Sequence, residues 1–314
     1  MSKQYRIGID IGGTKVNVGI VAQDGSILRK LSFPSQGADQ PRTFVALITR
    51  QVDEMLAQEG LSIDEIEHIG AGIPGTADYT RGIVEYSCNL FGEDQVPLAE
   101  LFAENWHHEV TIVQDSWAAA YAEYRFGSQR AHEHMLCVTV GTGIGCGVIV
   151  GGKVFSGAMH TAGEIGHTPI VWQGRPCACG KRGCLERYAS GTAILEQAME
   201  RFPEKLRDQP AKTESVFLLA YAGDGDALGL IAECVDKLAY GLALMIDILS
   251  TDTVVISGGL CAHRELFISP LQDKILSYGY PPWARKKKVT VSQAKLGSDA
   301  PMVGAAFLTR DEIV

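Results

Sequence analysis

The sequence lacks any uninterrupted apolar run that approaches the roughly 20 residues needed to cross a membrane. Its first apolar stretch is broken by Asp10 and by glycines, so we expect no signal peptide there. Positive charge is also scarce, because 28 Lys and Arg residues face 37 Asp and Glu residues, for a net charge of −9. The basic run at 285–288 is most simply a solvated approach to a strand. These absences predict a soluble, cytoplasmic protein whose main partner is neither a nucleic acid nor a membrane.

The sequence also lacks a low-complexity linker. With 314 residues, 46% of them hydrophobic, the chain is long enough for two lobes that each have a core. Without a linker, the boundary between the lobes must fall inside structured chain, and we place it near 115–130. We therefore expect an N-terminal lobe over 1–120 and a C-terminal lobe over 121–299, with a final helix at about 300–314 that returns to the first lobe.

Eight cysteines in a cytoplasmic chain are expected to be thiols or metal ligands rather than disulfides. Three of them, Cys177, Cys179 and Cys184, lie close together, and His167 precedes them. Thiolate sulfur and imidazole nitrogen are the usual tetrahedral zinc ligands, and four protein ligands leave no open position for catalysis. The sequence therefore predicts a structural zinc site in the loop 167–184. The alternative is a set of buried, inert cysteines around a core histidine, which the polar neighbours disfavour.

Two glutamates flank this loop, Glu164 before His167 and Glu186 after Cys184. A loop pinned by a metal can hold carboxylates rigidly toward a polar ligand, and hydroxyl groups are good partners for carboxylate oxygens. The alternative is that both glutamates are solvated, as most glutamates are.

A pattern of strands and glycine turns occurs twice in the sequence. The first occurrence has expected strands at 5–11, 16–21 and 27–33, with Gly12-Gly13-Thr14 after the first of them. The second has expected strands at 134–140, through 150, and at 154–155, with Gly141-Thr142-Gly143 after the first. This repeat predicts two related lobes of the α/β class.

The remaining elements follow from the spacing of apolar residues. Further strands are expected at 66–73, 110–113, 253–257 and 289–292. Helices are expected at 43–59, 97–105, 117–126, 189–202, 213–222, 226–249, 265–277 and 301–308.

Three glycine turns that follow expected strands are candidate phosphate sites. They are Asp10–Lys15, Gly141–Gly145 and Gly258-Gly259. Backbone N–H groups exposed in such turns can cradle phosphate. The first is neither a Walker A loop nor a Rossmann fingerprint, because it leads into a strand and its glycine spacing differs. One such turn alone is more often a plain hairpin, but three at strand ends favour a nucleotide between two lobes.

Asp115 stands where an expected strand ends and a helix begins. A carboxylate at the carboxyl end of a strand faces the ligand crevice of an α/β sheet. There it could accept the proton of a hydroxyl group whose oxygen attacks phosphorus. The alternative is that Asp115 is the helix N-cap, unless Ser116 caps the helix instead.

Together these motifs resemble the ROK family of bacterial sugar kinases, within the actin–Hsp70–sugar kinase superfamily. The resemblance runs nearly end to end and is most specific at Asp10–Lys15, Gly141–Gly145, Glu164–His167, Cys177–Gly180 and Gly183–Glu186. It implies two ribonuclease H-like lobes with a nucleotide and sugar cleft between them, and a homodimer. It also implies ATP-dependent phosphorylation of a hexose at its 6-hydroxyl group, with Mg²⁺ and a structural Zn²⁺ as cofactors.

The resemblance also assigns roles to single residues. Asp115 would be the general base. The sugar would be bound by Pro74, Gly75, Asn89, Gln114, Asp115, Glu164, His167 and Glu186. ATP and its Mg²⁺ would be surrounded by Asp10, Gly12, Gly13, Thr14, Lys15, Thr142, Gly143, Gly258 and Gly259. Zinc would be held by His167, Cys177, Cys179 and Cys184.

The chain departs from the family pattern next to the expected base. Family glucokinases usually read Asn-Asp-Ala-Asn there, and this chain has Gln114-Asp115-Ser116-Trp117. The family's Pro-Asn is Cys88-Asn89 here. We expect Gln114 to change which hydroxyl epimer fits and Trp117 to reshape the cleft. Because a site that hydrogen-bonds a hydroxyl group can strongly reject a wrong analogue, a sugar such as allose, fructose or N-acetylmannosamine stands beside glucose as a candidate.

Two other functions compete with a kinase. The family includes sugar-responsive repressors with an N-terminal DNA-binding domain, but here the first expected strand begins by residue 5 and the chain is acidic. A sugar-sensing pseudokinase is the other, and the presence of Asp115 and of two phosphate turns argues against lost chemistry.

Overall fold

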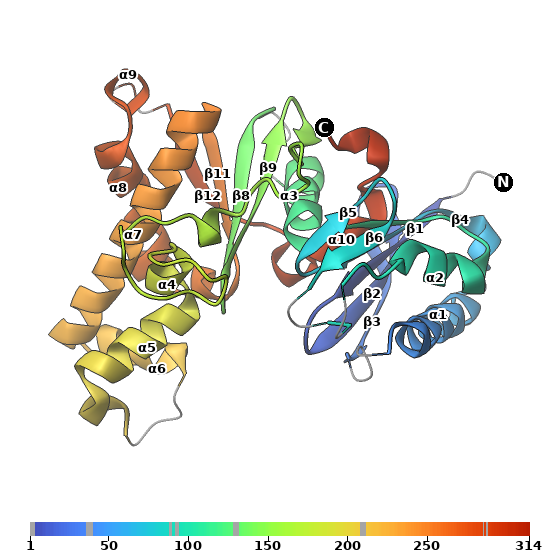
Figure 1. Cartoon of the computed structure of the whole chain (residues 1–314), viewed down its shortest axis with the longest axis horizontal. Coiled ribbons are helices and arrows are strands. Elements are labelled where there is room, and N and C mark those ends of the chain that lie inside the picture. Colours follow the sequence, from blue (N-terminus) through green and yellow to red (C-terminus); the bar gives the residue numbers. More distant parts are fainter. Residues whose placement is uncertain are drawn as a thin grey trace. The chain divides into compact units, whose positions relative to one another are not determined.

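The computed structural model describes residues 4–35, 40–87, 90–91, 94–127, 132–207, 212–284, 286 and 288–314 (Figure 1). The chain divides into two compact units that are each assembled from separated segments. Unit 1 comprises Met1–Glu133, Gly147–Ala162 and Lys295–Val314, and unit 2 comprises His134–Cys146 and Gly163–Ala294. The expected lobe limits at residues 120 and 299 stay a prediction.

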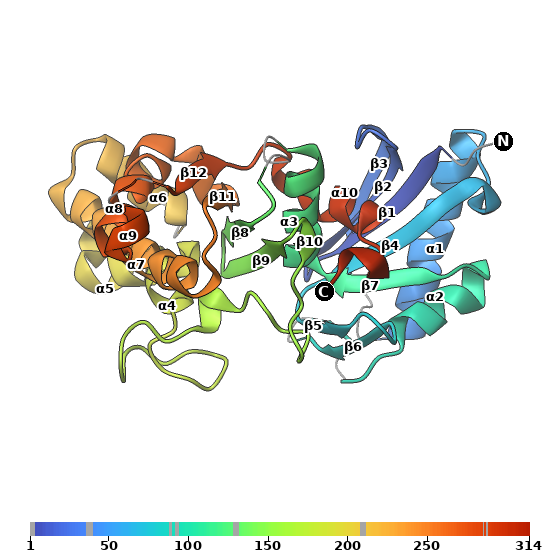
Figure 2. The same ribbon diagram turned by 90° about the horizontal axis from the view of Figure 1, so that it is seen from above.

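Unit 1 is built on a five-stranded sheet with the order β3-β2-β1-β4-β7. Its strands are β1 (Tyr5–Ile11), β2 (Lys15–Ala22), β3 (Ile27–Pro34), β4 (Ile66–Ile73) and β7 (Val110–Gln114). The first three pair antiparallel, because short turns join them, whereas β4 and β7 add in parallel beside β1. The carboxyl ends of β1, β4 and β7 therefore lie at one edge of the sheet (Figure 2).

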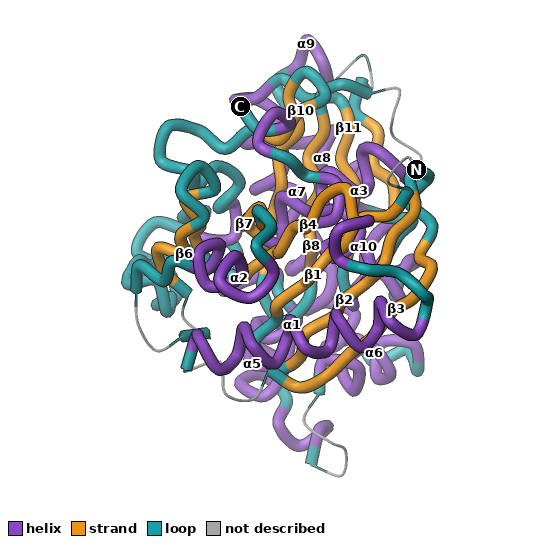
Figure 3. Tube along the Cα trace, turned by 90° about the vertical axis from the view of Figure 1, so that its right-hand side faces the viewer, coloured by secondary structure: helices purple, strands orange, loops and turns teal. Residues whose placement is uncertain are grey.

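The alternation of side chains along β1 separates the two faces of this sheet. Ile7, Ile9 and Ile11 are fully buried in one core cluster with apolar residues of α1 (Pro41–Gln58) and α2 (Leu98–Trp106). These two helices pack against each other (Figure 3). The isoleucines at every second position thus fix the face that the two helices cover.

Glycine on the alternate positions lets a helix approach the same sheet closely. A Cβ atom on Gly8 would lie 1.8 Å from the carbonyl oxygen of Met302, in α10 (Ala300–Phe307). Helix α10 packs on β1 and β4 and against α3 (Asp115–Phe126), which follows β7. A two-stranded sheet of β5 (Thr76–Asp78) and β6 (Ile83–Tyr86) completes the sheets of unit 1 among the described residues.

The second five-stranded sheet has the order β10-β9-β8-β11-β12. Its strands are β8 (Met135–Val140), β9 (Ile144–Val150), β10 (Lys153–Val154), β11 (Thr253–Ser257) and β12 (Thr290–Gln293). Strands β8, β11 and β12 are parallel and belong to unit 2, whereas β9 passes from unit 2 into unit 1 after Cys146. Both sheets thus have three consecutive strands followed by two parallel additions, which confirms the predicted repeat.

The helices of unit 2 come after the loop 167–184, which we call the metal loop, in the chain. They are α4 (Glu186–Ala189), α5 (Gly191–Arg201), α6 (Thr213–Tyr221), α7 (Gly225–Leu249), α8 (Leu271–Tyr278) and α9 (Pro281–Ala284). Shorter turns of helix along the chain are η1 (Ile63–Glu65), η2 (Ile165–His167), η3 (Pro203–Leu206), η4 (Gly259–Ala262), η5 (Arg264–Ile268), η6 (Gly297–Asp299) and η7 (Arg310–Glu312). Within the described ranges, no helix is both long and apolar enough to cross a membrane.

One expected helix is wrong in its extent. The apolar spacing at 265–277 predicted a single helix, but the structure has a π-helix at Arg264–Ile268 and then α8 from Leu271. Pro270 stands between the two, and proline lacks the N–H group that a continuing helix needs. The expected helix is therefore interrupted at Pro270, whose pyrrolidine ring would clash with the preceding helical turn.

Candidate functional site

The four predicted metal ligands come together in unit 2. Their ligand atoms, on His167, Cys177, Cys179 and Cys184, all lie within 4.8 Å of one another. The sulfur atoms of Cys179 and Cys184 are 3.7 Å apart, and the Cys177 sulfur is 3.7 Å from Nδ1 of His167. Two sulfurs bound at about 2.3 Å in a tetrahedron would be about 3.8 Å apart. The donor set and its spacing therefore fit a tetrahedral zinc ion.

The local fold of the loop explains why distant ligands converge. The backbone N–H of Cys177 donates to the Lys181 carbonyl at 2.9 Å, which closes the turn around Cys179. The N–H of Leu185 donates to the Thr168 carbonyl at 3.0 Å, so the chain after Cys184 returns beside the chain after His167. The turn passes Gly183 at φ +81°, a backbone angle that glycine adopts without a Cβ penalty.

The two flanking carboxylates are fixed differently. Glu186 is the first residue of α4, and its Oε2 accepts a 2.8 Å hydrogen bond from the backbone N–H of Ile144. Glu164 is the N-cap of η2, where its carbonyl accepts from the N–H of His167. Burial, and then the charge of Glu164, raise the pKa of the Cys146 thiol to about 12. Glu186 is therefore not simply a solvated surface charge, whereas Glu164 is exposed.

Two of the glycine turns lie side by side in unit 2. Gly141–Gly145 follows β8, and Gly258-Gly259 follows β11, whose last residue pairs with Thr139. A Cβ atom on Gly258, which has φ +98°, would lie 2.3 Å from the Val140 carbonyl oxygen. Thr142 is exposed in the first of these turns. The parallel pairing of β8 and β11 therefore brings both turns to one sheet edge.

The third glycine turn joins β1 to β2 in unit 1. The N–H of Gly12 donates to the Lys15 carbonyl at 2.9 Å, and Gly13, Thr14 and Lys15 are exposed. Just before it, the Asp10 carboxylate accepts a 2.9 Å hydrogen bond from the side-chain amide of Asn17. Burial raises the pKa of Asp10 above its ordinary value, while Asn17 works in the opposite direction.

Asp115 is the first residue of α3, directly after β7. Its Oδ1 accepts a 2.6 Å hydrogen bond from the N–H of Ser116, and the helix N-cap is Gln114, which makes no capping bond with its side chain. The alternative roles of Asp115 and Ser116 as N-cap are therefore wrong. The candidate base sits one position further into the helix, beside β4, where a Cβ atom on Gly72 would lie 3.5 Å from its Cα.

The other expected sugar contacts of unit 1 are only partly described. Pro74 and Gly75 follow β4, and Gly75 has φ +104° against the backbone of Tyr86. Gln114 is half-buried at the end of β7. Asn89, together with Cys88, lies outside the described residues.

Trp117 does not line an open surface. Its side chain is fully buried, and its indole N–H donates to the Ala162 carbonyl at 3.1 Å. The ring of Tyr79 meets it edge-on, with centroids 6.3 Å apart. The expectation that Trp117 reshapes the cleft directly is therefore wrong, because it acts as a packing residue.

Sequence reasoning missed Asn17. It is 3% exposed and is the cross-strand partner of Asp10 in the β1–β2 ladder. Its Oδ1 accepts a 2.7 Å hydrogen bond from the hydroxyl of Ser32, the next partner along the same row. The hairpin register was the signal, since residues paired across a turn face the same side.

Known proteins agree with this architecture. The sequence profile of the ROK family matches residues 6–312. A glucokinase from Thermotoga maritima is 33% identical over 322 residues, which cover 100% of this chain and 99% of the relative. A xylose repressor from Bacillus subtilis is 24% identical over 99% of this chain and 78% of the repressor. A ROK family glucokinase from Streptomyces griseus, solved in complex with glucose and AMPPNP, matches with a TM-score of 0.80 at 30% identity, over 98% of this chain and 99% of that chain.

These matches confirm the predicted fold class, an α/β chain with two ribonuclease H-like lobes of the actin-like ATPase type. The chain belongs to the ROK family.

Proposed function

We propose that the protein is an ATP-dependent hexose kinase that phosphorylates the 6-hydroxyl group of its sugar. The observation that carries this proposal is the placement of two carboxylates at one sheet edge. Asp10, the last residue but one of β1, pairs with Gly72 of β4, and Gly72 pairs with Val113 of β7, two residues before Asp115. Since neighbouring strands are about 4.8 Å apart, the backbones of Asp10 and Val113 lie about 10 Å apart across β4. Asp115 begins α3 two residues beyond Val113.

Asp115 would act as the general base. Its carboxylate takes the proton of the sugar hydroxyl while the oxygen attacks the γ-phosphorus of ATP, and ADP leaves. Its position at the start of α3, after a parallel strand, supports this role, because ligands of α/β sheets meet the carboxyl ends of strands. Asp10 offers the hard oxygen donor that Mg²⁺ prefers, and Mg²⁺ would neutralise phosphoryl charge.

The glycine turns would hold the nucleotide. Their exposed backbone N–H groups supply donors to phosphate oxygens without side-chain bulk. We assign ATP to Gly12, Gly13, Thr14, Lys15, Thr142, Gly143, Gly258 and Gly259. The bound AMPPNP of the Streptomyces griseus relative supports a nucleotide as the phosphoryl donor.

The metal loop would shape the sugar site. With four protein ligands, the zinc ion would have a structural role. It would hold the metal loop so that the loop orients Glu164 and Glu186, which flank it in the sequence. We assign sugar hydroxyls to Glu164, His167, Glu186, Asn89 and Gln114, with Pro74 and Gly75 beside them. The bound glucose of the same relative supports a hexose as the acceptor.

The test is ADP release with Mg-ATP over a panel of epimeric aldohexoses, amino and N-acetyl hexoses, and ketohexoses. We expect one sugar to stand out. If glucose gives the highest rate of ADP release, the kinase tolerates Gln114 in place of asparagine. If another sugar does, Gln114 has a role in specificity. No release above background with any sugar would overturn the proposal.

A second candidate is a sugar-responsive regulator, which the similarity to the xylose repressor supports. It predicts tight binding to a specific DNA duplex that the cognate sugar releases. The net charge of −9 opposes such binding, because phosphate contacts need an excess of basic side chains. Titration of the protein against duplexes at two salt concentrations distinguishes the two functions.

We further propose a cytoplasmic location and a homodimer. The cysteines support the first, since the seven that the structure describes form no disulfide. Light scattering after gel filtration tests the second.

A further inference from the structure

The backbone of Ile144, in the turn Gly141–Gly145, is held on two sides by neighbours of the metal ligands. Its N–H donates to Oε2 of Glu186 at 2.8 Å, and Glu186 follows Cys184 by two residues. Its carbonyl oxygen abuts Gly166, where a Cβ atom would lie only 2.2 Å away, and Gly166 precedes His167. Both ends of the metal loop therefore touch one residue of the turn.

The contact with Glu186 is close enough to constrain the turn. A Cβ atom on Gly143 would lie 2.4 Å from Oε2 of Glu186, so the carboxylate packs directly on the turn's backbone. Ile144 is 6% exposed, and an N–H group buried away from water needs a partner. An oxygen of the Glu186 side chain supplies that partner.

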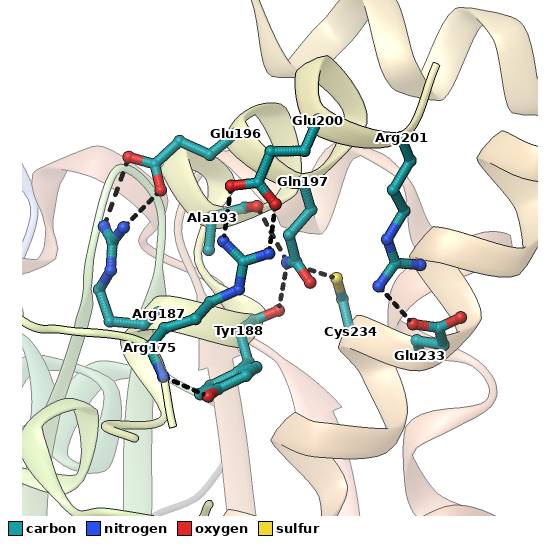
Figure 4. A network of polar contacts seen from close by, with 10 residues as sticks. All are labelled: Arg175, Arg187, Tyr188, Ala193, Glu196, Gln197, Glu200, Arg201, Glu233 and Cys234. Carbon is teal, nitrogen blue, oxygen red and sulfur yellow. Dashed lines mark hydrogen bonds and ion pairs between the residues drawn. The ribbon is translucent and has the colours of Figure 1, made fainter. Parts of the chain in front are cut away.

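Helix α5 makes a second connection between the same parts. Its first residue, Gly191, donates its N–H to the Gly141 carbonyl at 2.7 Å. Further along, Glu196 pairs with Arg187 at 2.6 Å and Glu200 pairs with Arg175 at 2.9 Å, as Figure 4 shows. Arg187 and Arg175 flank the metal ligands Cys184 and Cys177 in the sequence. The helix thus ties the metal loop to the start of the turn.

We propose that Glu186 is a positioning residue for the turn Gly141–Gly145, to which we assign phosphate, in addition to its role toward the sugar. Its Oε2 fixes the N–H of Ile144, so the turn keeps the shape that presents Thr142 and Gly143 to a nucleotide. A sugar hydroxyl would then meet Oε1. Nucleotide binding in unit 2 therefore depends on the metal loop, and this inference rests on the proposed kinase function.

The test compares Glu186→Gln with Glu186→Ala. Glutamine keeps a carbonyl oxygen that can accept from Ile144, whereas alanine leaves the N–H unpaired. AMPPNP is titrated into each protein without sugar, so that contacts to sugar do not contribute. We expect affinity to fall by about tenfold or more in Glu186→Ala and to stay within about twofold of the wild type in Glu186→Gln. Glu164→Ala is the matched control, since it removes the other flanking carboxylate.

Equal affinity in the wild type and Glu186→Ala would overturn the inference, as would an equal loss in Glu186→Gln and Glu186→Ala. Amide hydrogen exchange in the peptide that covers 141–145 gives a readout that needs no nucleotide. We expect Ile144 to exchange faster in Glu186→Ala and after chelation of the metal, but not in Glu186→Gln. If the wild type fails to bind AMPPNP, the kinase proposal falls, and the exchange of Ile144 still decides whether Glu186 holds the turn.

Discussion

The side-chain amide of Asn17 donates a 2.9 Å hydrogen bond to the carboxylate of Asp10, its cross-strand partner in the β1–β2 hairpin. The Ser32 hydroxyl donates to the amide oxygen of Asn17, which leaves the NH₂ group facing Asp10. Asn17 on β2 and Ser32 on β3 thus orient the half-buried carboxylate of Asp10. We assign Mg²⁺ to Asp10, and burial raises the pKa of this carboxyl group while the bond from Asn17 lowers it.

Removal of Asn17 should shift the acid side of the activity profile to higher pH. Burial raises the pKa of Asp10 and Asn17 opposes that rise, so Asn17→Ala raises this pKa further. Because Asp10 must be ionised to bind Mg²⁺, kcat/KM for Mg-ATP then falls off at a higher pH. The measurement is the pH dependence of kcat/KM. Asn105→Ala, which removes an amide bonded to Leu101 of α2, is the control, and an unchanged profile in Asn17→Ala would contradict the assignment.

Asp115→Asn should abolish most turnover. Asparagine keeps the shape of the side chain but cannot take the proton of the sugar hydroxyl, and loss of a general base costs about 10²–10⁴-fold in kcat. The bond from the N–H of Ser116 survives, because the amide oxygen still accepts, so thermal stability and metal content should be unchanged. Near wild-type turnover in a folded Asp115→Asn protein would show that Asp115 is not the general base.

The stability of unit 1 should fall as the pH drops below about 6.5, through His68. Burial lowers the pKa of His68, whose neutral ring lies between the Ala306 carbonyl and the Thr111 hydroxyl. The unfolded chain has the ordinary value of about 6.5. Between the lowered pKa and 6.5 the unfolded state binds more protons, so the free energy of unfolding decreases with falling pH and levels off below the folded pKa.

The measurement for His68 is urea unfolding at several pH values from about 4 to about 8, a range that spans the ordinary histidine pKa of about 6.5. His68→Gln should flatten the acid part of the curve. His107→Asn is the control, because His107 is exposed in a left-handed conformation that asparagine tolerates. An identical pH dependence in His68→Gln and the wild type would show that the loss of stability at low pH arises from other groups.

Cys177→Ser should release the metal and destabilise unit 2. The four ligands converge from separate positions of one loop, and such a site does not exist in the unfolded chain, so the binding energy of the metal is part of the folding energy. We expect bound zinc to fall from about one ion per chain to near zero. Cys261→Ala is the control, since this buried cysteine stands outside the metal cluster and its Sγ contacts the Ile256 carbonyl. Full zinc content in Cys177→Ser would reject Cys177 as a ligand.

How much the sequence revealed depended on how local each signal was. The strands β1 and β4 were predicted to the residue, because each is rich in isoleucine and ends at a turn that contains glycine. The metal cluster was predicted because its ligands lie within one short loop. The β5–β6 hairpin was missed, because Thr76–Asp78 is too short for a pattern to show. The bond between Glu186 and Ile144 spans 42 residues, and no local pattern encodes it.

Sugar choice could depend on packing around Trp117, which is fully buried, or on contact with Gln114, which is half-buried at the end of β7. Trp117→Phe loses the bond from the indole N–H to the Ala162 carbonyl, and one such hydrogen bond contributes about 0.5–1.5 kcal/mol to stability. We therefore expect a lower melting temperature with an unchanged order of preferred hexoses. Gln114→Asn restores the residue usual in family glucokinases, and we expect it to change that order toward glucose.

The measurement is kcat/KM for each hexose of the panel, beside thermal unfolding of both variants. One hydrogen bond to a hydroxyl group can change discrimination by about tenfold or more, so a change of that size is expected in Gln114→Asn alone. If Trp117→Phe reorders the sugars and Gln114→Asn does not, specificity is transmitted through the packing of α3 on Ala162 rather than through contact at the end of β7.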